Sequence, residues 1–407
     1  MNNKAREQAS GSSLPVNDRR GPLSGLKVID LTHMLAGPYC TWLLGAMGAE
    51  IIKVEMPGSG DFTRSIAPFT NGRSAYFCSV NRNKRSITLN LKQALGKKAL
   101  LRLVQSADVF VENNRPGVMQ RLGFDYTALS KINPRLIYAS ISGFGQTGPY
   151  SNRPAFDAVI QAMSGIMSIT GDENGAPARV GTSIGDIGAS LFGTIGVLAA
   201  LNDRTATGRG THVDVAMLDS QIALLENAVA RYLNVGDIPR RIGSRHPLIA
   251  PFQAFPTKDE PIVVCVDTED QWGRFCKAIN RTDLMSNPRF SSGSKRAEYH
   301  GELEPELIKA LVNRSRADWL SIFDAADVPC GPINDVPAVV KDPQIVARGM
   351  IVPEGNGAYV NQPIHFSQYT QMSQQPAPEL GSDTSDLLAE HGFTSEEIAN
   401  MRDQGAI

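Results

Sequence analysis

One acid in this chain stands where its carboxylate could react with a bound molecule. Asp186 lies between Gly185 and Gly188, and small and apolar residues follow it at helical spacing, with no charge until Asp203. Asp is favoured in a first helical turn, where free backbone N–H groups stabilise an anion. The glycines remove side-chain bulk, so a large molecule could approach the carboxylate. Two interpretations stay open: a reactive carboxylate, or an Asp that only caps a buried helix.

A glycine-rich segment is a second candidate. G-F-G-Q-T-G at 143–148 matches the dinucleotide motif G-x-G-x-x-G and follows a predicted strand. That motif needs a helix that begins at once, so that the helix N-terminus meets the pyrophosphate. Pro149 and Pro154 delay the next helix to about residue 154. A glycine turn that lines a site is therefore favoured over a nicotinamide-dinucleotide site.

Other charged residues have a plain structural alternative. Asp157 stands at a predicted helix start, where Asp is a common cap. Arg82, Lys84 and Arg85 place three cations within four residues, which could meet the phosphates of a nucleotide-like ligand. Such a run of charge is more commonly a solvated face, and we favour that interpretation.

Composition and missing motifs exclude several classes of protein. With 42% hydrophobic residues, 20% charged residues and a net charge of −1, the chain predicts an ordinary globular protein without nucleic acid or an acidic membrane as partner. The apolar run at 187–201 has 15 residues and three glycines, too few to span a bilayer. Histidines at metal-binding spacing are absent, so no metal is expected. The five scattered cysteines predict free thiols in a reducing cytoplasm.

Alternating strands and helices must position these candidates. Apolar runs predict the strands, and helical periodicity predicts the helices between them. The strands are expected at 26–31, 50–55, 108–113, 135–141 and 211–216. The helices are expected at about 39–47, 92–107, 126–132, 187–201 and 217–235. This alternation predicts an α/β fold with a parallel sheet.

The chain is expected to divide into two domains, because 407 residues are too many for one ordinary core. Residues 1–20 are polar and predict a disordered tail, and a large α/β domain follows at 21–235. A smaller α+β domain is expected at 236–327, with two strands joined at 258–260 and helices near 269–279, 302–313 and 316–325. Residues 328–407 return to the large domain and end in a polar tail.

An ordered set of short motifs resembles the class III CoA-transferases, the family of formyl-CoA and carnitine CoA-transferases. Among them are L-S-G-L-K-V-I-D-L-T-H-M-L-A-G-P, G-A-E-I-I-K-V-E, I-S-G-F-G-Q-T-G-P, G-D-I-G and V-P-C-G-P-I-N. The whole set lies at 23–38, 48–55, 80–92, 108–113, 115–123, 141–149, 185–188, 207–217 and 328–334. Within the family, I-T-G-x-E-N-G-x-P at 169–177 resembles the succinyl-CoA–dicarboxylate branch, typified by the glutarate enzymes.

The resemblance implies an interlocked homodimer with a Rossmann-like large domain, built from both ends of the chain, and a small inserted α+β domain. It implies a coenzyme A thioester as substrate, with no permanently bound cofactor, and small carboxylic acids as the other partners. The family's nucleophile falls on Asp186, and its second acid on Asp157. The positions that contact CoA fall on His33, Ala36, Lys92, Asn113, Arg121 and Met217.

Four positions depart from the family's pattern, namely Leu35, Met56, Asn114 and Phe156. Leu35 and Phe156 replace a glutamine and a tyrosine of the formyl enzymes, which argues against the formyl/oxalyl substrate pair. The related α-methylacyl-CoA racemases need a histidine where this chain has Phe156, so one of their two acid–base catalysts is missing. We therefore favour a transferase, with a racemase, a nicotinamide oxidoreductase and a non-catalytic acyl-CoA-binding protein as the alternatives.

The expected reaction moves CoA from an acyl-CoA, with succinyl-CoA as the favoured donor, to a small dicarboxylate. A carboxylate of ordinary pKa is ionised at pH 7 and attacks without a general base, through an aspartyl anhydride and then an aspartyl–CoA thioester. Gly143, Gly145 and Gly243 lie in turns whose N–H groups could stabilise the oxyanion.

The far carboxylate of a dicarboxylate needs a cationic partner, and a bidentate arginine serves best. Arg64 follows the second predicted strand, in a loop of the kind that presents ligand-binding residues. Arg245 and His246 lie at 241–252, the segment that also contains Gly243 and replaces the glycine loop of the formyl enzymes. We expect at least one of these three side chains to bind the far carboxylate, the alternative being that all three are surface residues.

Overall fold

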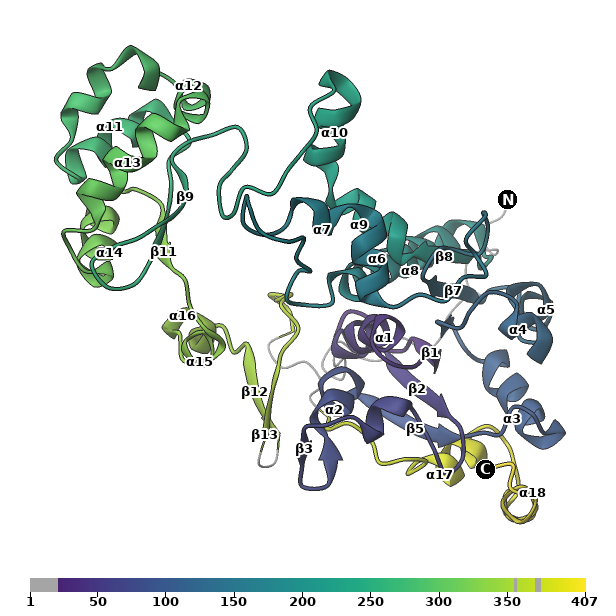
Figure 1. Ribbon diagram of the computed structural model, residues 1–407. Coiled ribbons are helices and arrows are strands. Elements are labelled where there is room, and N and C mark those ends of the chain that lie inside the picture. Colours follow the sequence, from purple (N-terminus) through teal and green to yellow (C-terminus); the bar gives the residue numbers. More distant parts are fainter. Residues whose placement is uncertain (1–20, 355–356, 370–374) are drawn as a thin grey trace, which may run out of the picture. The chain divides into compact units, whose positions relative to one another are not determined.

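The computed structural model describes residues 21–354, 357–369 and 375–407 (Figure 1). The tail predicted at 1–20 lies outside the described residues. The chain forms two compact units. The first combines the chain up to Ile166 with Val180–Ala230 and Gly349–Ile407, and the second consists of Met167–Arg179 and Arg231–Arg348. The second unit thus begins and ends at other residues than 236 and 327, and it includes a segment that precedes α8 (Ile184–Thr207).

The first unit is built on a six-stranded sheet whose strands are all parallel. In spatial order they are β5 (Lys84–Thr88), β2 (Glu50–Glu55), β1 (Lys27–Leu31), β6 (Val109–Glu112), β7 (Ile137–Ser142) and β8 (His212–Ala216). The chain builds outward from β1 on one side and then, from β6, on the other. This is the order of a doubly wound dinucleotide-binding sheet, and it confirms the predicted α/β class.

Helices and short strands complete the first unit. Its α-helices are α1 (Ala36–Ala46), α2 (Ala75–Asn81), α3 (Ala94–Gln105), α4 (Val118–Leu122), α5 (Tyr126–Ile132), α6 (Asp157–Ser164), α8, α9 (Met217–Leu224), α17 (Thr384–Glu390) and α18 (Ser395–Asp403). A 3-10 turn, η2, covers Phe62–Ser65. The small hairpins are β3 (Phe69–Thr70) with β4 (Arg73–Ser74), and β12 (Ile351–Glu354) with β13 (Gly357–Val360). The helix predicted at 217–235 is interrupted at Leu225, where α9 ends before α10 (Glu226–Val235) begins.

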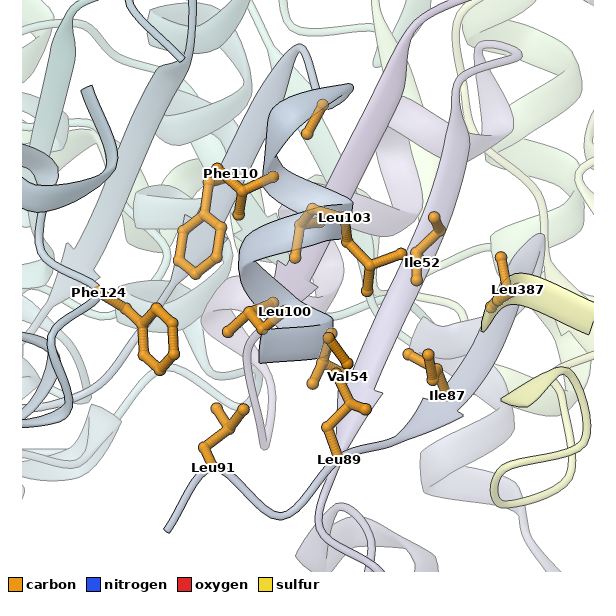
Figure 2. Close-up of a cluster of buried hydrophobic side chains, with 14 of the residues drawn as sticks. Ile52, Val54, Ile87, Leu89, Leu91, Leu100, Leu103, Phe110, Phe124 and Leu387 are labelled. Carbon is orange, nitrogen blue, oxygen red and sulfur yellow. The ribbon is translucent and has the colours of Figure 1, made fainter. Parts of the chain in front are cut away.

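The sheet buries apolar side chains on both faces, as a parallel sheet covered by helices requires. Figure 2 shows one face, where Leu100 and Leu103 of α3 lie beside Ile52, Val54 and Phe110 of the strands. The other face packs against α1 and α8, through the residues Cys40, Leu44, Ala189, Val197 and Ala200. Both cores therefore depend on strands that are apolar on two sides.

The C-terminal segment is not a polar tail, as the sequence predicted, but part of the core. Leu387 and Leu388 of α17 and Met401 of α18 are buried with the residues of Figure 2. The same segment covers the outer edge of β5, because the N–H groups of Ser86 and Thr88 donate to Asp383 and Thr384. Residues at the start of α17 thus satisfy backbone N–H groups of the edge strand β5. Both helices are short and have few apolar residues, so their sequence alone shows little periodicity.

Helix α8 has 24 residues, more than the 15 predicted, and by length and composition alone it could cross a membrane. One face of the helix packs on the sheet. A Cβ at Gly193 would lie 2.9 Å from Ile141 of β7, and one at Gly196 would lie 2.6 Å from Val213 of β8. Its glycines thus let the helix lie directly on the sheet.

The second unit has its own apolar core around a small antiparallel sheet. The sheet contains β9 (Phe252–Phe255), β10 (Ile262–Cys265) and β11 (Cys330–Pro332), and the first two are joined through 258–260 as predicted. The helices are α11 (Glu269–Ala278), α12 (Gly293–Glu298), α13 (His300–Leu311), α14 (Arg316–Ala325), α15 (Val336–Val339) and α16 (Pro343–Ala347), with 3-10 turns η3 (Thr282–Ser286) and η4 (Pro288–Phe290). Helix α7 (Ile166–Ile169) and α10 lie where the chain passes between the units.

Candidate active site

The carboxyl ends of β1 and β6 form the point where the strand order reverses, and in such sheets ligands bind outside that point. His33 follows β1, and Asn113 follows β6. The His33 N–H donates to Asn113 Oδ1 over 2.9 Å, and Asn113 Nδ2 donates to the His33 carbonyl over 2.7 Å. Two predicted CoA-contact residues are therefore held together at the reversal point.

The other predicted CoA-contact residues also follow carboxyl ends of strands. Ala36 begins α1 after β1, and Met217 begins α9 after β8; both are buried. Lys92 follows β5, and Arg121 lies in α4 after β6; both are exposed. The topology thus brings all of these residues to one edge of the sheet. Their contact with CoA stays a prediction.

Asp186 lies in the first turn of α8, close to the start of α1. The hydroxyl of Ser190 is 2.7 Å from the carbonyl oxygen of Asp186 and 2.6 Å from that of Ala36. One buried side chain therefore links the turn that carries the candidate nucleophile to the helix that follows the His33 turn. This contact joins two parts of the site that are 154 residues apart in sequence.

Asp157 caps α8 from a neighbouring helix. Its Oδ1 accepts the N–H of Gly185 over 2.8 Å, and its Oδ2 accepts Nε2 of Gln161 over 2.8 Å. Ser183, the residue in the N-cap position of α8, makes no side-chain cap. Asp157 therefore takes over the usual role of the N-cap residue and lies beside the candidate nucleophile.

The electrostatic environment of Asp186 differs from the sequence expectation. Burial, together with the negative charge of Asp157, raises the pKa of Asp186 to about 7. The sequence argument assumed an ordinary carboxyl that is fully ionised at pH 7, and this assumption is wrong. The cause is desolvation, which depends on what covers the side chain rather than on its neighbours in the chain.

Glycines beside Asp186 serve packing. A Cβ at Gly185 would lie 2.4 Å from Gln221 Nε2 and 3.0 Å from Asp157 Oδ1, so a larger residue here would displace these side-chain ends. The Oε1 of Gln221 accepts the hydroxyl of Ser164 over 2.6 Å. Sequence analysis missed Gln161, Ser164 and Gln221, because single buried polar side chains within apolar helices carry no local signal.

Tyr76 of α2 is another residue that sequence analysis missed. Burial raises the pKa of its phenol, and the negative charges of Asp186, Asp61 and Asp157 raise it further. The phenol therefore lies within electrostatic reach of the candidate nucleophile, although it is 110 residues away in sequence.

The glycine turn at 143–148 follows β7, and the next helix begins only at Asp157, as the prolines predicted. The N–H of Gly145 donates to Ser142 Oγ, and that of Gln146 donates to Asp214 Oδ2. These donors are therefore unavailable for a pyrophosphate or, at Gly145, for an oxyanion. Gly243 is likewise engaged, since its N–H donates to the Gly171 carbonyl.

The basic cluster is not a solvated face, and it is not open to phosphates. Lys84 is buried, and its ammonium lies 2.8 Å from Asp30 Oδ2. Arg82 is also buried, and Arg85 pairs with Glu50 and Glu390. The expectation failed because β5 is a charged strand whose partners lie far away in sequence.

The candidates for the far carboxylate already have partners within the chain. Arg64 binds both oxygens of Glu55, at 2.8 and 2.7 Å, and stacks on Phe77. Arg64 would have to leave this pairing to bind a substrate carboxylate, so its role there stays a prediction.

Within the second unit, Arg245 pairs with Glu173 at 2.7 Å and lies 3.2 Å from His300 Nδ1. The Nδ1 of His246 accepts the N–H of Leu248. Neither side chain is a free cation in this structure, so a role in substrate binding requires a partner exchange. No cluster that could hold a metal ion occurs among residues 21–354, 357–369 and 375–407.

The raised pKa of Asp186 predicts a stability change that can be measured without any substrate. The folded state holds the Asp186 proton up to about pH 7, whereas the unfolded chain releases it near pH 4, so the folded state loses stability as the pH rises between these values. Asp186→Asn should therefore raise the free energy of unfolding at pH 8 by up to about 4 kcal/mol, and change it little at pH 4. Urea denaturation at both pH values measures this.

The control is Asp203→Asn, at the exposed end of the same helix, which should give no such pH-dependent gain. An Asp186→Asn variant that is no more stable than the wild type at pH 8 would show that this carboxylate is not desolvated.

Comparison with known proteins now identifies the fold. Residues 23–384 match the CoA-transferase family III. The acetyl-CoA:oxalate CoA-transferase of Acetobacter aceti is 44% identical over 91% of this chain and 96% of its own. The succinyl-CoA:glutarate CoA-transferase of Homo sapiens is 39% identical over 91% of this chain and 86% of its own.

Solved structures agree with this assignment. A CAIB/BAIF family protein from Brucella suis superimposes with a TM-score of 0.82 and 37% identity, over 91% of this chain and 99% of that one. The family match extends from before β1 to the start of α17, so it includes every strand of the parallel sheet. The chain belongs to the CoA-transferase family III, and it is a CoA-transferase.

Proposed function

We propose that this protein transfers CoA from an acyl-CoA donor, with succinyl-CoA as the favoured donor, to a small dicarboxylate, and that Asp186 is the nucleophile. The observation that supports this most directly is a desolvated carboxylate in the first turn of α8, a turn that Ser190 links to the start of α1, next to the reversal point of the sheet. The named acceptors of the relatives are dicarboxylates, oxalate and glutarate, whereas their donors differ. The acceptor class is thus better supported than the donor.

The proposed reaction exchanges one acyl bond for another at each step. The Asp186 carboxylate attacks the thioester carbonyl, which forms a mixed anhydride and releases CoA thiolate. The thiolate attacks the aspartyl carbonyl, which forms an aspartyl–CoA thioester and releases the donor acid. The acceptor carboxylate then attacks this thioester, and the returning thiolate takes the acceptor acyl group and frees Asp186. The thioester is conserved, so the transfer requires no external energy source.

The environment of Asp186 suits a nucleophile of this kind. A carboxylate of raised pKa is more basic and therefore more nucleophilic, and near neutral pH a large fraction of it is still ionised. Asp157 contributes to this state by its charge and holds the helix end through the Gly185 N–H. We assign Asp157 a positioning and electrostatic role rather than a covalent one.

A racemase is disfavoured at the same place. Phe156, the residue before Asp157, is 70% exposed and offers no group that could exchange a proton. α-Proton exchange needs two acid–base groups on opposite faces of the substrate carbon. The transferase proposal needs only the carboxylate.

We further propose that the protein works as a homodimer in the cytoplasm. Apolar side chains on α8 and α9 are exposed in the single chain, namely Leu191, Phe192, Ile195, Ile222 and Leu224. An apolar surface of this kind on two packed helices fits a second copy of the chain, and the interlocked form is what the resemblance implies. The five free cysteines fit a reducing compartment.

A panel assay tests the proposed reaction. Succinyl-CoA and acetyl-CoA should be combined with oxalate, succinate, glutarate and matched monocarboxylates, and the CoA products read by mass. We expect transfer to at least one dicarboxylate, and Asp186→Asn should lower its rate by several orders of magnitude because no acyl bond to the enzyme can form. A variant that retains more than about a tenth of wild-type turnover would remove Asp186 as the nucleophile. Monocarboxylates as the better acceptors would contradict the dicarboxylate assignment.

The pH dependence of kcat/KM should follow the Asp186 carboxyl. The rate constant should fall about tenfold per pH unit below about pH 7, because only the ionised form attacks. Asp157→Asn should move this midpoint to lower pH, since it removes a negative charge while its amide oxygen can still accept the Gly185 N–H. Asp219→Asn, an exposed change on α9, is the control. An unchanged or higher midpoint in Asp157→Asn would refute the electrostatic role.

The dimer interface can be tested by one charge. Ile195→Glu, at a position 60% exposed in the single chain, should convert the dimer to a monomer because an unpaired charge would be buried between the two copies. Light scattering after size-exclusion chromatography measures the mass. Val346→Glu, at a position 61% exposed, is the matched control and should leave the mass unchanged. Equal masses for wild type and Ile195→Glu would place the interface elsewhere.

A further inference from the structure

The turn between β1 and α1 has a backbone that needs external support. Met34 adopts φ +67, in the left-handed region that residues with a side chain rarely enter. Such a conformation costs about 1–3 kcal/mol and persists only where the surroundings hold it. The turn, residues 32–35, also contains His33, and it lies at the reversal point of the sheet.

A buried ion pair supplies that support. The ammonium of Lys53, on β2, donates to the carbonyl of Thr32 over 2.9 Å and to Asp61 Oδ2 over 3.0 Å. Asp61 Oδ1 accepts the Met34 N–H over 3.4 Å. Lys53 therefore binds the Thr32 carbonyl, and Asp61 binds the Met34 N–H. These two groups lie on either side of His33, and both charged side chains come from outside the turn.

The pair is fully desolvated and ties three segments together. Lys53 is 0% exposed, and Asp61 is 4% exposed. Asp61 also accepts the N–H and hydroxyl of Thr63, the second residue of the turn η2 that follows β2. Burial opposes the charge on Lys53, but the nearby Asp30 and Asp61 carboxylates keep its pKa raised. Lys53 thus remains a cation inside the sheet.

Stability alone does not account for such a pair. Taking two charges out of water costs about as much as their attraction returns, and apolar replacements of similar volume are often no less stable. The specific gain is geometric, because a buried cation and anion fix the positions of the Thr32 carbonyl and the Met34 N–H.

We propose that Lys53 and Asp61 are positioning residues that hold the 32–35 turn in its CoA-binding conformation, and that they control the affinity for the CoA thioester rather than the chemical step. This inference rests on the proposed function, since the turn matters only if CoA binds there. Neither side chain reaches solvent, so both act through the backbone of the turn.

The test is the double variant Lys53→Met/Asp61→Asn. Methionine fills most of the lysine volume, and asparagine can still accept the Thr63 N–H, so the fold should persist without the two charges. We expect the Kd for coenzyme A, measured by calorimetry, and the KM for the acyl-CoA to rise at least about tenfold. The kcat and the KM for the dicarboxylate should change less than about threefold.

A second ion pair serves as the matched control. Arg204 and Asp108 pair at 2.8 Å near the amino ends of β6 and β7, where Arg204 also donates to the Arg135 carbonyl. Arg204→Met/Asp108→Asn should leave the Kd for coenzyme A unchanged, even where it lowers the melting temperature by a similar amount. An equal loss of affinity in this control would show a general effect of lost stability and overturn the inference.

An unchanged Kd in Lys53→Met/Asp61→Asn also overturns the inference. If the double variant fails to fold, Asp61→Asn alone is used, with an expected rise of about threefold in Kd, and no rise would overturn it as well. The proposed function is judged separately. Transfer by the wild type and its loss in Asp186→Asn decide the function, so a folded double variant with wild-type affinity would end only the proposal for Lys53 and Asp61.

Discussion

Buried charge inside the parallel sheet is the constraint on which this structure depends. Lys53, Asp30 and Lys84 lie on three strands and are almost fully buried, and each finds an opposite charge within 3.0 Å. An unpaired charge at any of these positions would cost several kcal/mol, so the strands and the loop after β2 can be assembled in essentially one way. Asp30 responds accordingly: burial would raise its pKa, but Lys84 and Lys53 hold it well below the ordinary value.

The part of the site around Asp186 depends on helix ends rather than on strands. Helix α8 is apolar enough to lie on the sheet, and its glycines let α9 and Asp157 approach its first turn. Because Ser183 leaves that turn without a side-chain cap, Asp157 from α6 supplies it. The same carboxylate that fixes the helix end also makes the charge on Asp186 less favourable, so structural support and electrostatic tuning come from one residue.

This arrangement lowers the stability of the folded protein and makes the Asp186 carboxylate more basic. Burial and the nearby negative charge of Asp157 both disfavour the ionised form of Asp186, and its pKa rises to about 7. Gln161 and the Gly185 N–H donate to the oxygens of Asp157. Different environments thus give these two chemically equal groups different roles.

The sequence by itself determined the elements with clear periodicity, such as β2 and α5, the parallel α/β class, and the family through its ordered motifs. It also singled out Asp186, because glycine neighbours and a long apolar helix are local features. Only the tertiary structure decided the pairing of Lys84, the engagement of Arg64 by Glu55, the place of the C-terminal helices in the core, and the pKa of Asp186. Periodicity reports which way a side chain faces along its own element. Desolvation and charge pairing depend on which distant residues cover it, and that information exists only once the chain has folded.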